Sequence, residues 1–196
     1  MDATGERSFL TDRGASVHLG HVESEVLDEV DVLHVPLYSL LTGALAESAY
    51  ALIGEALERN ISVTISTSSL SALREFGRTE FLSLIKNMSP DVVFANQPEA
   101  RYVLKGHPWF VGAGSTVVTA GERAARLTRP DGSDYRRVPE SVDVRDTTGA
   151  GDAFTAGFLV AWGSGADPEA CLVAGHSLAA RVLGEPGAHL AMDKGD

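Results

Sequence analysis

The stretch DTTGAGDAFTAGF, residues 146–158, carries the pattern on which the prediction of the fold rests. A glycine–alanine–glycine run stands directly before an apolar segment that is predicted to be a helix. Glycine allows the backbone to approach a ligand closely, and the first amide groups of a helix have no partner inside the helix. Together with the positive end of the helix dipole, these amides form a site that suits phosphate oxygens.

A carboxylate, Asp152, stands where this helix is expected to begin. In phosphoryl transfer such a group can orient an attacking alcohol and accept its proton. A carboxylate in the first turn of a helix can also act only as a capping group that stabilises the helix end. The length of the pattern favours the catalytic role, because capping requires neither two glycines nor the preceding threonines and second aspartate.

On both sides of this stretch, apolar runs of strand length alternate with longer segments of helical periodicity. This alternation predicts an α/β domain with a mostly parallel sheet that is covered on both faces. The predicted strands are 31–35, 61–65, 91–95, 116–119, 125–128 and 135–138, and the predicted helices are 42–60, 71–86, 98–104, 152–162 and 168–183. Residues 7–10 and 15–19 flank a turn-like segment and are predicted to form either a further pair of short strands or an extended excursion. The last helix is predicted to have Asp167 as its N-cap.

The composition is that of a soluble globular protein, with 44% hydrophobic and 22% charged residues among 196. A formal net charge of -11 argues against nucleic acid or an anionic membrane as a partner. The single cysteine, Cys171, cannot form an internal disulfide and is interpreted as a small buried apolar residue. Since no apolar run is long enough to cross a bilayer, we expect a cytoplasmic protein.

The motif at 146–158 resembles the signature of the ribokinase-like (PfkB) carbohydrate kinases, and other segments resemble that family in the expected order. GERSFLTDRGA (5–15) is similar to its lid region, DVVFANQPEA (91–100) to its Asn-x-x-Glu motif, and VVTAGERAA (117–125) to its phosphate loop. The resemblance implies a three-layer α/β/α ribokinase-like fold with a mostly parallel central sheet. The chain, 1–196, would then be one kinase domain, the C-terminal two-thirds of the family fold, with 1–20 as a remnant of the β lid.

The resemblance also implies the roles of the residues at the glycine-rich turn. Asp152 matches the base that takes the proton from a sugar hydroxyl. Gly149, Ala150 and Gly151 match the anion hole, whose amides stabilise the transferring phosphoryl group. The implied activity is ATP-dependent phosphorylation of a hydroxymethyl group of a sugar or sugar-like molecule.

Four more residues match the family's nucleotide and metal sites. Asn96 and Glu99 match the motif that holds Mg²⁺ and its waters, which agrees with the preference of this ion for a few oxygen ligands and retained water. Outside the family context, Glu99 would be interpreted as a solvated carboxylate in the first turn of a short helix. Thr119 and Gly121 match the loop beside the nucleotide phosphates.

Two further matches are less constant within the family. His176 falls where many members place an asparagine near the adenine, although it can equally be an ordinary helix histidine. Asp146 matches a position that helps to hold a monovalent cation such as K⁺ in some members. Some members also pair through their lids, so a homodimer through the lid remnant is compatible with the resemblance.

The sequence departs from the family pattern in three ways. Ala124 stands where members often have a second glycine, and Ser66 begins a serine-rich segment where many have Asp-Pro. The N-terminal region of the family, with its first strands and its sugar-gripping carboxylate, has no counterpart, so we expect an exposed sheet edge and apolar face. The alternative function is therefore a non-catalytic nucleotide-binding remnant, or a fragment of a split or truncated kinase. A nucleoside or vitamin kinase is a further alternative, but the polar residues at 5–15 favour a sugar.

Overall fold

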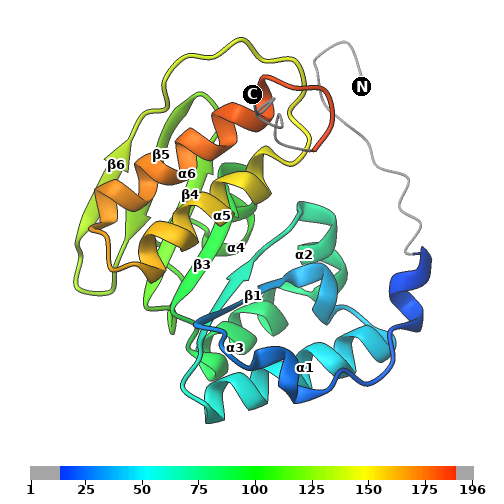
Figure 1. Cartoon of the computed structure of the whole chain (residues 1–196). Coiled ribbons are helices and arrows are strands. Elements are labelled where there is room, and N and C mark those ends of the chain that lie inside the picture. Colours follow the sequence, from blue (N-terminus) through cyan, green and yellow to red (C-terminus); the bar gives the residue numbers. More distant parts are fainter. Residues whose placement is uncertain (1–13, 189–196) are drawn as a thin grey trace.

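The computed structural model describes residues 14–188, which form a central sheet with helices on both faces (Figure 1). Within this range the strands are β1 (Val32–Pro36), β2 (Ser62–Ser66), β3 (Val92–Asn96), β4 (Ser115–Ala120), β5 (Arg123–Thr128) and β6 (Asp134–Arg137). The α-helices are α1 (Gly43–Glu58), α2 (Leu70–Phe76), α3 (Arg78–Met88), α4 (Gln97–Leu104), α5 (Ala150–Gly163) and α6 (Pro168–Leu183). The short 3-10 helices are η1 (Gly14–His18), η2 (Ser24–Leu27) and η3 (Leu37–Leu40).

The strands form one sheet in the order in which they occur along the chain, from β1 to β6. β1 to β4 are parallel, and β5 and β6 add an antiparallel hairpin. The predicted mostly parallel sheet is therefore confirmed. Among the described residues β1 pairs only with β2, so one side of this apolar strand remains as a sheet edge.

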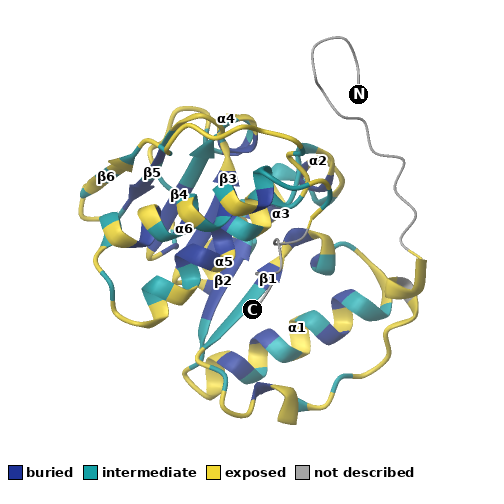
Figure 2. Cartoon of the chain, turned by 45° about the horizontal axis from the view of Figure 1, so that its top comes forward, coloured by how far each residue is buried: buried dark blue, intermediate teal, exposed yellow. Residues whose placement is uncertain are grey.

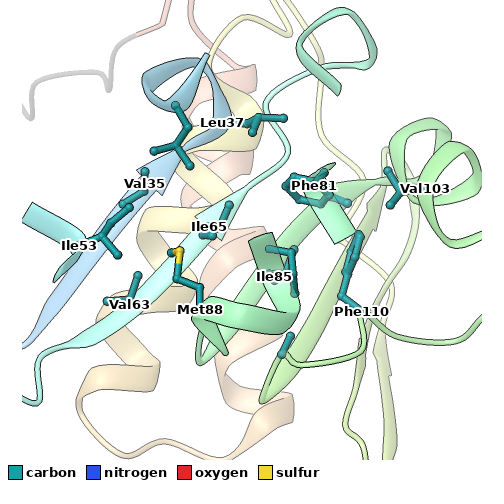
Figure 3. Packing of buried hydrophobic residues seen from close by; sticks show 14 of the residues in the cluster. Val35, Leu37, Ile53, Val63, Ile65, Phe81, Ile85, Met88, Val103 and Phe110 are labelled. Carbon is teal, nitrogen blue, oxygen red and sulfur yellow. The ribbon is translucent and has the colours of Figure 1, made fainter. Parts of the chain in front are cut away.

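Each face of the sheet is covered by its own hydrophobic core, because alternate residues of a strand point to opposite faces. On one face, Val63 and Ile65 of β2 pack with residues of α1 to α4, such as Phe81 and Ile85 (Figure 3). On the other face, α5 and α6 lie side by side across β3 to β5 (Figure 1). Figure 2 shows the buried central strands in dark blue between the helices. The result is the predicted three-layer α/β/α arrangement.

The strands from β1 to β6, and the helices α1, α4, α5 and α6, lie within a few residues of their predicted positions. Asp167 caps α6 as predicted, since its side chain accepts a hydrogen bond from the amide of Ala170 at 2.9 Å. The helix predicted at 71–86 is wrong in one respect. It is divided into α2 and α3 at Gly77, whose φ of 94° lies in a region that favours glycine and does not continue a helix.

The predicted lid remnant is largely outside the described residues. The strand expected at 7–10 lies entirely outside them. The strand expected at 15–19 is wrong, because most of that segment belongs to the 3-10 helix η1. No strand is formed by residues 14–20, the part of the remnant that the structure describes. In the same described range, 14–188, no helix combines the length and the apolar character needed to span a bilayer.

Candidate functional site

A cavity of about 570 Å³ lies where the end of β4, the start of α5, one side of α6 and the segment 138–144 meet. Its size is typical of a small-molecule site. The predicted residues Thr119, Gly121, Ala150, Gly151 and His176 all line it. Three parts of the chain, around positions 119–121, 150–151 and 176, are thus brought to one cavity. Their predicted roles toward a nucleotide and a phosphoryl group stay predictions.

The start of α5 faces this cavity without a capping side chain. Gly149 occupies the N-cap position with a φ of 77°, and its carbonyl accepts the first helical bond from the amide of Ala153 at 2.8 Å. Among the described residues no side chain caps this helix end, so the amides of Gly151 and Asp152 are not bonded by a cap. Uncapped amides at a helix start, together with the helix dipole, attract an anion.

The carboxylate of Asp152 is exposed in the first turn of α5. It is not among the residues that line the cavity, but it directly follows Gly151, which does. The side chain is therefore neither packed in the core nor distant from the helix start. A group in this position can reach a molecule that approaches the uncapped amides from solvent.

Asp146 holds the glycine-rich turn in place. Its Oδ1 accepts hydrogen bonds from the amide and the hydroxyl of Thr148, at 2.9 Å and 2.8 Å. Its Oδ2 accepts a hydrogen bond at 3.0 Å from the amide of Gly187, beyond the end of α6. Both carboxylate oxygens are thus used to join two distant segments of the chain. The predicted contact of Asp146 with a monovalent cation stays a prediction.

Asn96 and Glu99 form a capping box at the start of α4. The side-chain oxygen of Asn96 accepts from the amide of Glu99 at 2.9 Å, and the Glu99 carboxylate accepts from the backbone and side-chain nitrogens of Asn96. Glu99 is only 4% exposed, so it is not a solvated first-turn carboxylate. The pair neither lines the cavity nor lies far from it, because Asn96 is the register partner of Thr119, which does line it.

Thr67, for which no role was predicted, supports this buried carboxylate. Thr67 is fully buried, and its hydroxyl donates to Oε2 of Glu99. Together with Asn96 it supplies three hydrogen bonds to Glu99, which offset the cost of burying the charge. The available signal was the position of Thr67 directly after β2. Because β2 and β3 are parallel, this position lies at the same carboxyl end of the sheet as Asn96.

His176 combines the two interpretations that the sequence left open. It lines the cavity, yet its Nε2 lies 3.0 Å from the carbonyl of Arg137, and its ring meets the edge of Phe154. Burial lowers the pKa of His176, and the hydrogen bond to the Arg137 carbonyl opposes that shift in part. The ring is thus fixed as part of the cavity wall.

One wall of the cavity is a segment that sequence reasoning missed. Val138, Val142 and Val144 line the cavity and are exposed, with Val138 at 69% and Val142 at 38%. Three exposed valines on one short segment are unusual without a partner, since exposed apolar patches mark interaction sites. The available signal was the recurrence of valine in VPESVDV (138–144), a segment that forms no strand. The lining of the cavity therefore combines these apolar side chains with the backbone at the start of α5.

Comparison with known proteins identifies the family. Residues 1–194 match the model of the pfkB family carbohydrate kinases. The chain belongs to the PfkB family. Among the proteins it resembles, an ATP-dependent ribose-1-phosphate kinase of Halopiger xanaduensis is 29% identical over 197 residues, which are 97% of this chain and 62% of that protein. Fructoselysine 6-kinase of Escherichia coli (strain K12) is 36% identical over 102 residues, which are 50% of this chain and 38% of that protein.

The solved structures place the PfkB chain in the ribokinase-like fold. The crystal structure of adenosine kinase from Sinorhizobium meliloti matches with a TM-score of 0.82 and 26% identity, over 90% of this chain and 56% of that one. A probable sugar kinase from Rhizobium etli CFN 42 matches equally well. The chain thus spans somewhat more than half the length of the solved structures that it matches.

Proposed function

We propose that this chain carries the phosphoryl-transfer site of an ATP-dependent kinase that phosphorylates a hydroxymethyl group of a sugar or sugar-like molecule. The observation that carries the proposal is the uncapped start of α5, where Ala150 and Gly151 line the cavity and Asp152 follows with an exposed carboxylate. Phosphoryl transfer requires mainly positioning and stabilisation of negative charge, and this helix start offers both.

We infer how a nucleotide would lie in the cavity from the residues that line it. The valines at 138, 142 and 144 offer an apolar surface for the base, and the wall containing His176 continues it. Thr119, Gly121 and the amides at the start of α5 would face the phosphates. This orientation places the terminal phosphate beside Gly151. The carboxylate of Asp152 would then take the hydroxyl proton as the alcohol oxygen forms its bond to the terminal phosphorus of ATP. The bond from that phosphorus to the leaving ADP breaks at the same time.

The hydrogen bonds of Asn96 and Glu99 fit a supporting role toward Mg²⁺. Oε2 of Glu99 already accepts two hydrogen bonds, whereas Oε1 accepts one from Asn96 and keeps a lone pair. A buried carboxylate with one remaining acceptor site suits a hydrogen bond to a metal-bound water more than direct ligation. When bound, Mg²⁺ would neutralise charge on the phosphates. The protein's own contribution is the fixed, charge-bearing Glu99, which is bonded to Asn96, the register partner of Thr119.

The substitution Asp152→Asn tests the catalytic role. It should lower turnover by two orders of magnitude or more, the contribution typical of a general base, and leave the affinity for ATP nearly unchanged. Asp167→Asn is the matched control, since it makes the same change at the start of the neighbouring helix α6, where asparagine caps about as well as aspartate. Turnover of Asp152→Asn near that of the unchanged protein would show that another group orients the alcohol.

A second candidate function is a nucleotide-binding remnant, or a fragment that needs another polypeptide for activity. It is favoured by β1, which pairs on one side with no strand among the described residues. Titration calorimetry with ATP and Mg²⁺, next to a phosphorylation screen, distinguishes the two. The screen would include ribose, ribose 1-phosphate, fructoselysine and adenosine, chosen from the relatives' substrates. ATP binding without turnover on any of them would favour the second candidate.

A further inference from the structure

A second hollow, of about 410 Å³, lies beside α4 and the β4–β6 part of the sheet. Its residues come from α4, the segment after it, and the strands β4, β5 and β6. They are Gln97, Ala100, Arg101, Leu104, Gly106, His107, Pro108, Val118, Ala120, Ala124, Arg126 and Arg136. None of these residues lines the proposed nucleotide cavity.

The two hollows lie on opposite faces of the same strands. In β4, Val118 and Ala120 line the second hollow, whereas Thr119 between them lines the nucleotide cavity. In β6, Arg136 lines the second hollow, whereas Arg137 points to the other face and pairs with Glu169 of α6. Since alternate strand residues point to opposite faces, the second hollow is a separate site and not an extension of the first.

The rim of the second hollow is cationic in a chain whose net charge is -11. Arg126 and Arg136 are held side by side by Asp134, which lies between them and accepts a hydrogen bond from Arg126 Nε at 2.7 Å and one from Arg136 Nη2 at 2.9 Å. The terminal nitrogens of Arg126 contact no acceptor among the described residues, and the same part of the chain offers the guanidinium of Arg101 no partner. With one carboxylate for three guanidinium groups, the rim retains about two positive charges.

The floor of the hollow is apolar. It is formed by small and aliphatic side chains from α4, from the segment after it and from the strands, and the small ones leave the space that makes the hollow. These residues are Ala100, Leu104, Pro108, Val118, Ala120 and Ala124. Arginine recognises phosphate and carboxylate groups through paired N–H donors, and an apolar floor favours a ligand that has a flat hydrophobic part.

We propose that this second hollow binds a small phosphate ester that has a compact apolar body, independently of the kinase site. The phosphate would lie between Arg101 and the pair Arg126 and Arg136, and the apolar body would cover Ala124 and its neighbours on the floor. Such a ligand would be recognised by both parts of the hollow. Inorganic phosphate would contact only the rim, and an uncharged aromatic alcohol only the floor.

Titration calorimetry with 1-naphthyl phosphate as the probe tests this site. The full chain should bind the probe, and Arg101→Gln and Arg136→Gln should each weaken binding by about five- to tenfold, because each removes a charge-assisted contact. Ala124→Leu should weaken it by filling the floor. Lys86→Gln is the matched control, because it removes one exposed positive charge from α3 and touches neither hollow. Circular dichroism would show that each variant is folded.

Two comparisons separate this site from the nucleotide cavity and from general charge attraction. ADP with Mg²⁺ should not displace the probe, and 1-naphthol and inorganic phosphate should each bind at least tenfold more weakly. The proposal is overturned if the full chain does not bind the probe at millimolar concentration, or if ADP displaces it competitively. It is also overturned if both arginine variants bind as well as Lys86→Gln, or if inorganic phosphate binds as tightly as the probe.

Discussion

Alanine in place of Gly149 should destabilise the protein through the backbone and through one contact. The φ of 77° at this residue lies in the left-handed region, where a residue with a Cβ costs about 1–2 kcal/mol relative to glycine. A Cβ at this position would also lie 2.8 Å from the Cβ of Ala188 and 3.2 Å from its Cα, closer than side chains pack. Relief of that overlap requires movement of the segment that Asp146 holds, so we expect a total loss of about 2–4 kcal/mol.

Gly151→Ala is the matched substitution, two residues along the same turn. A Cβ there meets nothing within 4 Å, and the residue lies inside α5, where alanine is a better helix former by up to about 1 kcal/mol. Urea unfolding followed by circular dichroism should therefore show a clear loss for Gly149→Ala and no loss, or a small gain, for Gly151→Ala. For ATP binding we expect the opposite order of the two variants. Gly151→Ala should bind ATP more weakly than Gly149→Ala, because a methyl group at Gly151 enters the cavity.

The reasoning would be refuted by either of two results. Ordinary surface substitutions change the free energy of unfolding by up to about 0.5 kcal/mol. If the free energy of unfolding of Gly149→Ala differs from that of the unchanged protein by no more than this, the turn does not require glycine. If Gly151→Ala is destabilised as strongly as Gly149→Ala, the loss does not arise from backbone conformation and the contact with Ala188. The urea dependence of the free energy should be equal in all three proteins, so that the comparison reports stability alone.

Three other perturbations have definite expected outcomes. Thr67→Val removes a buried donor to Glu99 and should lower the free energy of unfolding by about 1–3 kcal/mol, measured in urea. Asp146→Asn replaces an acceptor oxygen and should speed amide exchange in the segments that it joins, seen by hydrogen exchange. Burial lowers the pKa of His34 from 6.5 to about 4, so the folded state resists protonation of this ring. The free energy of unfolding should therefore have its full value above pH 6.5 and should fall as the pH is lowered towards 4. Between pH 7 and 5 the loss should be about 1–2 kcal/mol, and His34→Asn should remove it.

Each of these substitutions has a control on the surface. Thr79→Val, on the exposed side of α3, is the control for Thr67→Val. His18→Asn, exposed in η1, is the control for His34→Asn, and Asp131→Asn, in the exposed hairpin turn, is the control for Asp146→Asn. A stability loss as large for Thr79→Val as for Thr67→Val would argue against the role of the buried hydroxyl. If the stability of His34→Asn depends on pH as strongly as that of the unchanged protein, the pH dependence arises from other groups. Amide exchange that is unchanged by Asp146→Asn would show that the turn is held by other contacts.

Periodicity predicted most of the fold because buried strands and amphipathic helices leave a direct pattern in the sequence. The run DVVFA became β3, and the apolar stretch after Gly151 became α5, since each must bury its apolar residues. The division at Gly77 was missed, because a glycine within a helical pattern is compatible with either outcome until its φ is fixed by packing. Ala15 to Leu19 have strand-like residues but no partner strand among the described residues, and part of this segment forms η1.

The candidate site was predictable where a motif is local and hidden where it depends on tertiary contacts. Gly149 to Asp152 are contiguous, and the arrangement found at the start of α5 has the uncapped amides that the pattern predicts. Thr67 and Glu99 are 32 residues apart, and only the pairing of β2 with β3 brings them together. The valine wall at 138–144 has no regular structure, so no period could reveal it.

The hydrogen bond between Asp146 and Gly187 links residues 41 positions apart, which bears on the order of folding. During synthesis the glycine-rich turn cannot reach its final position until α6 and the residues after it have left the ribosome and docked. The proposed phosphoryl-transfer site would then be among the last parts of the molecule to form. A nucleotide added to refolding protein should accordingly act late, by trapping docked α6, and should leave the earliest collapse unchanged.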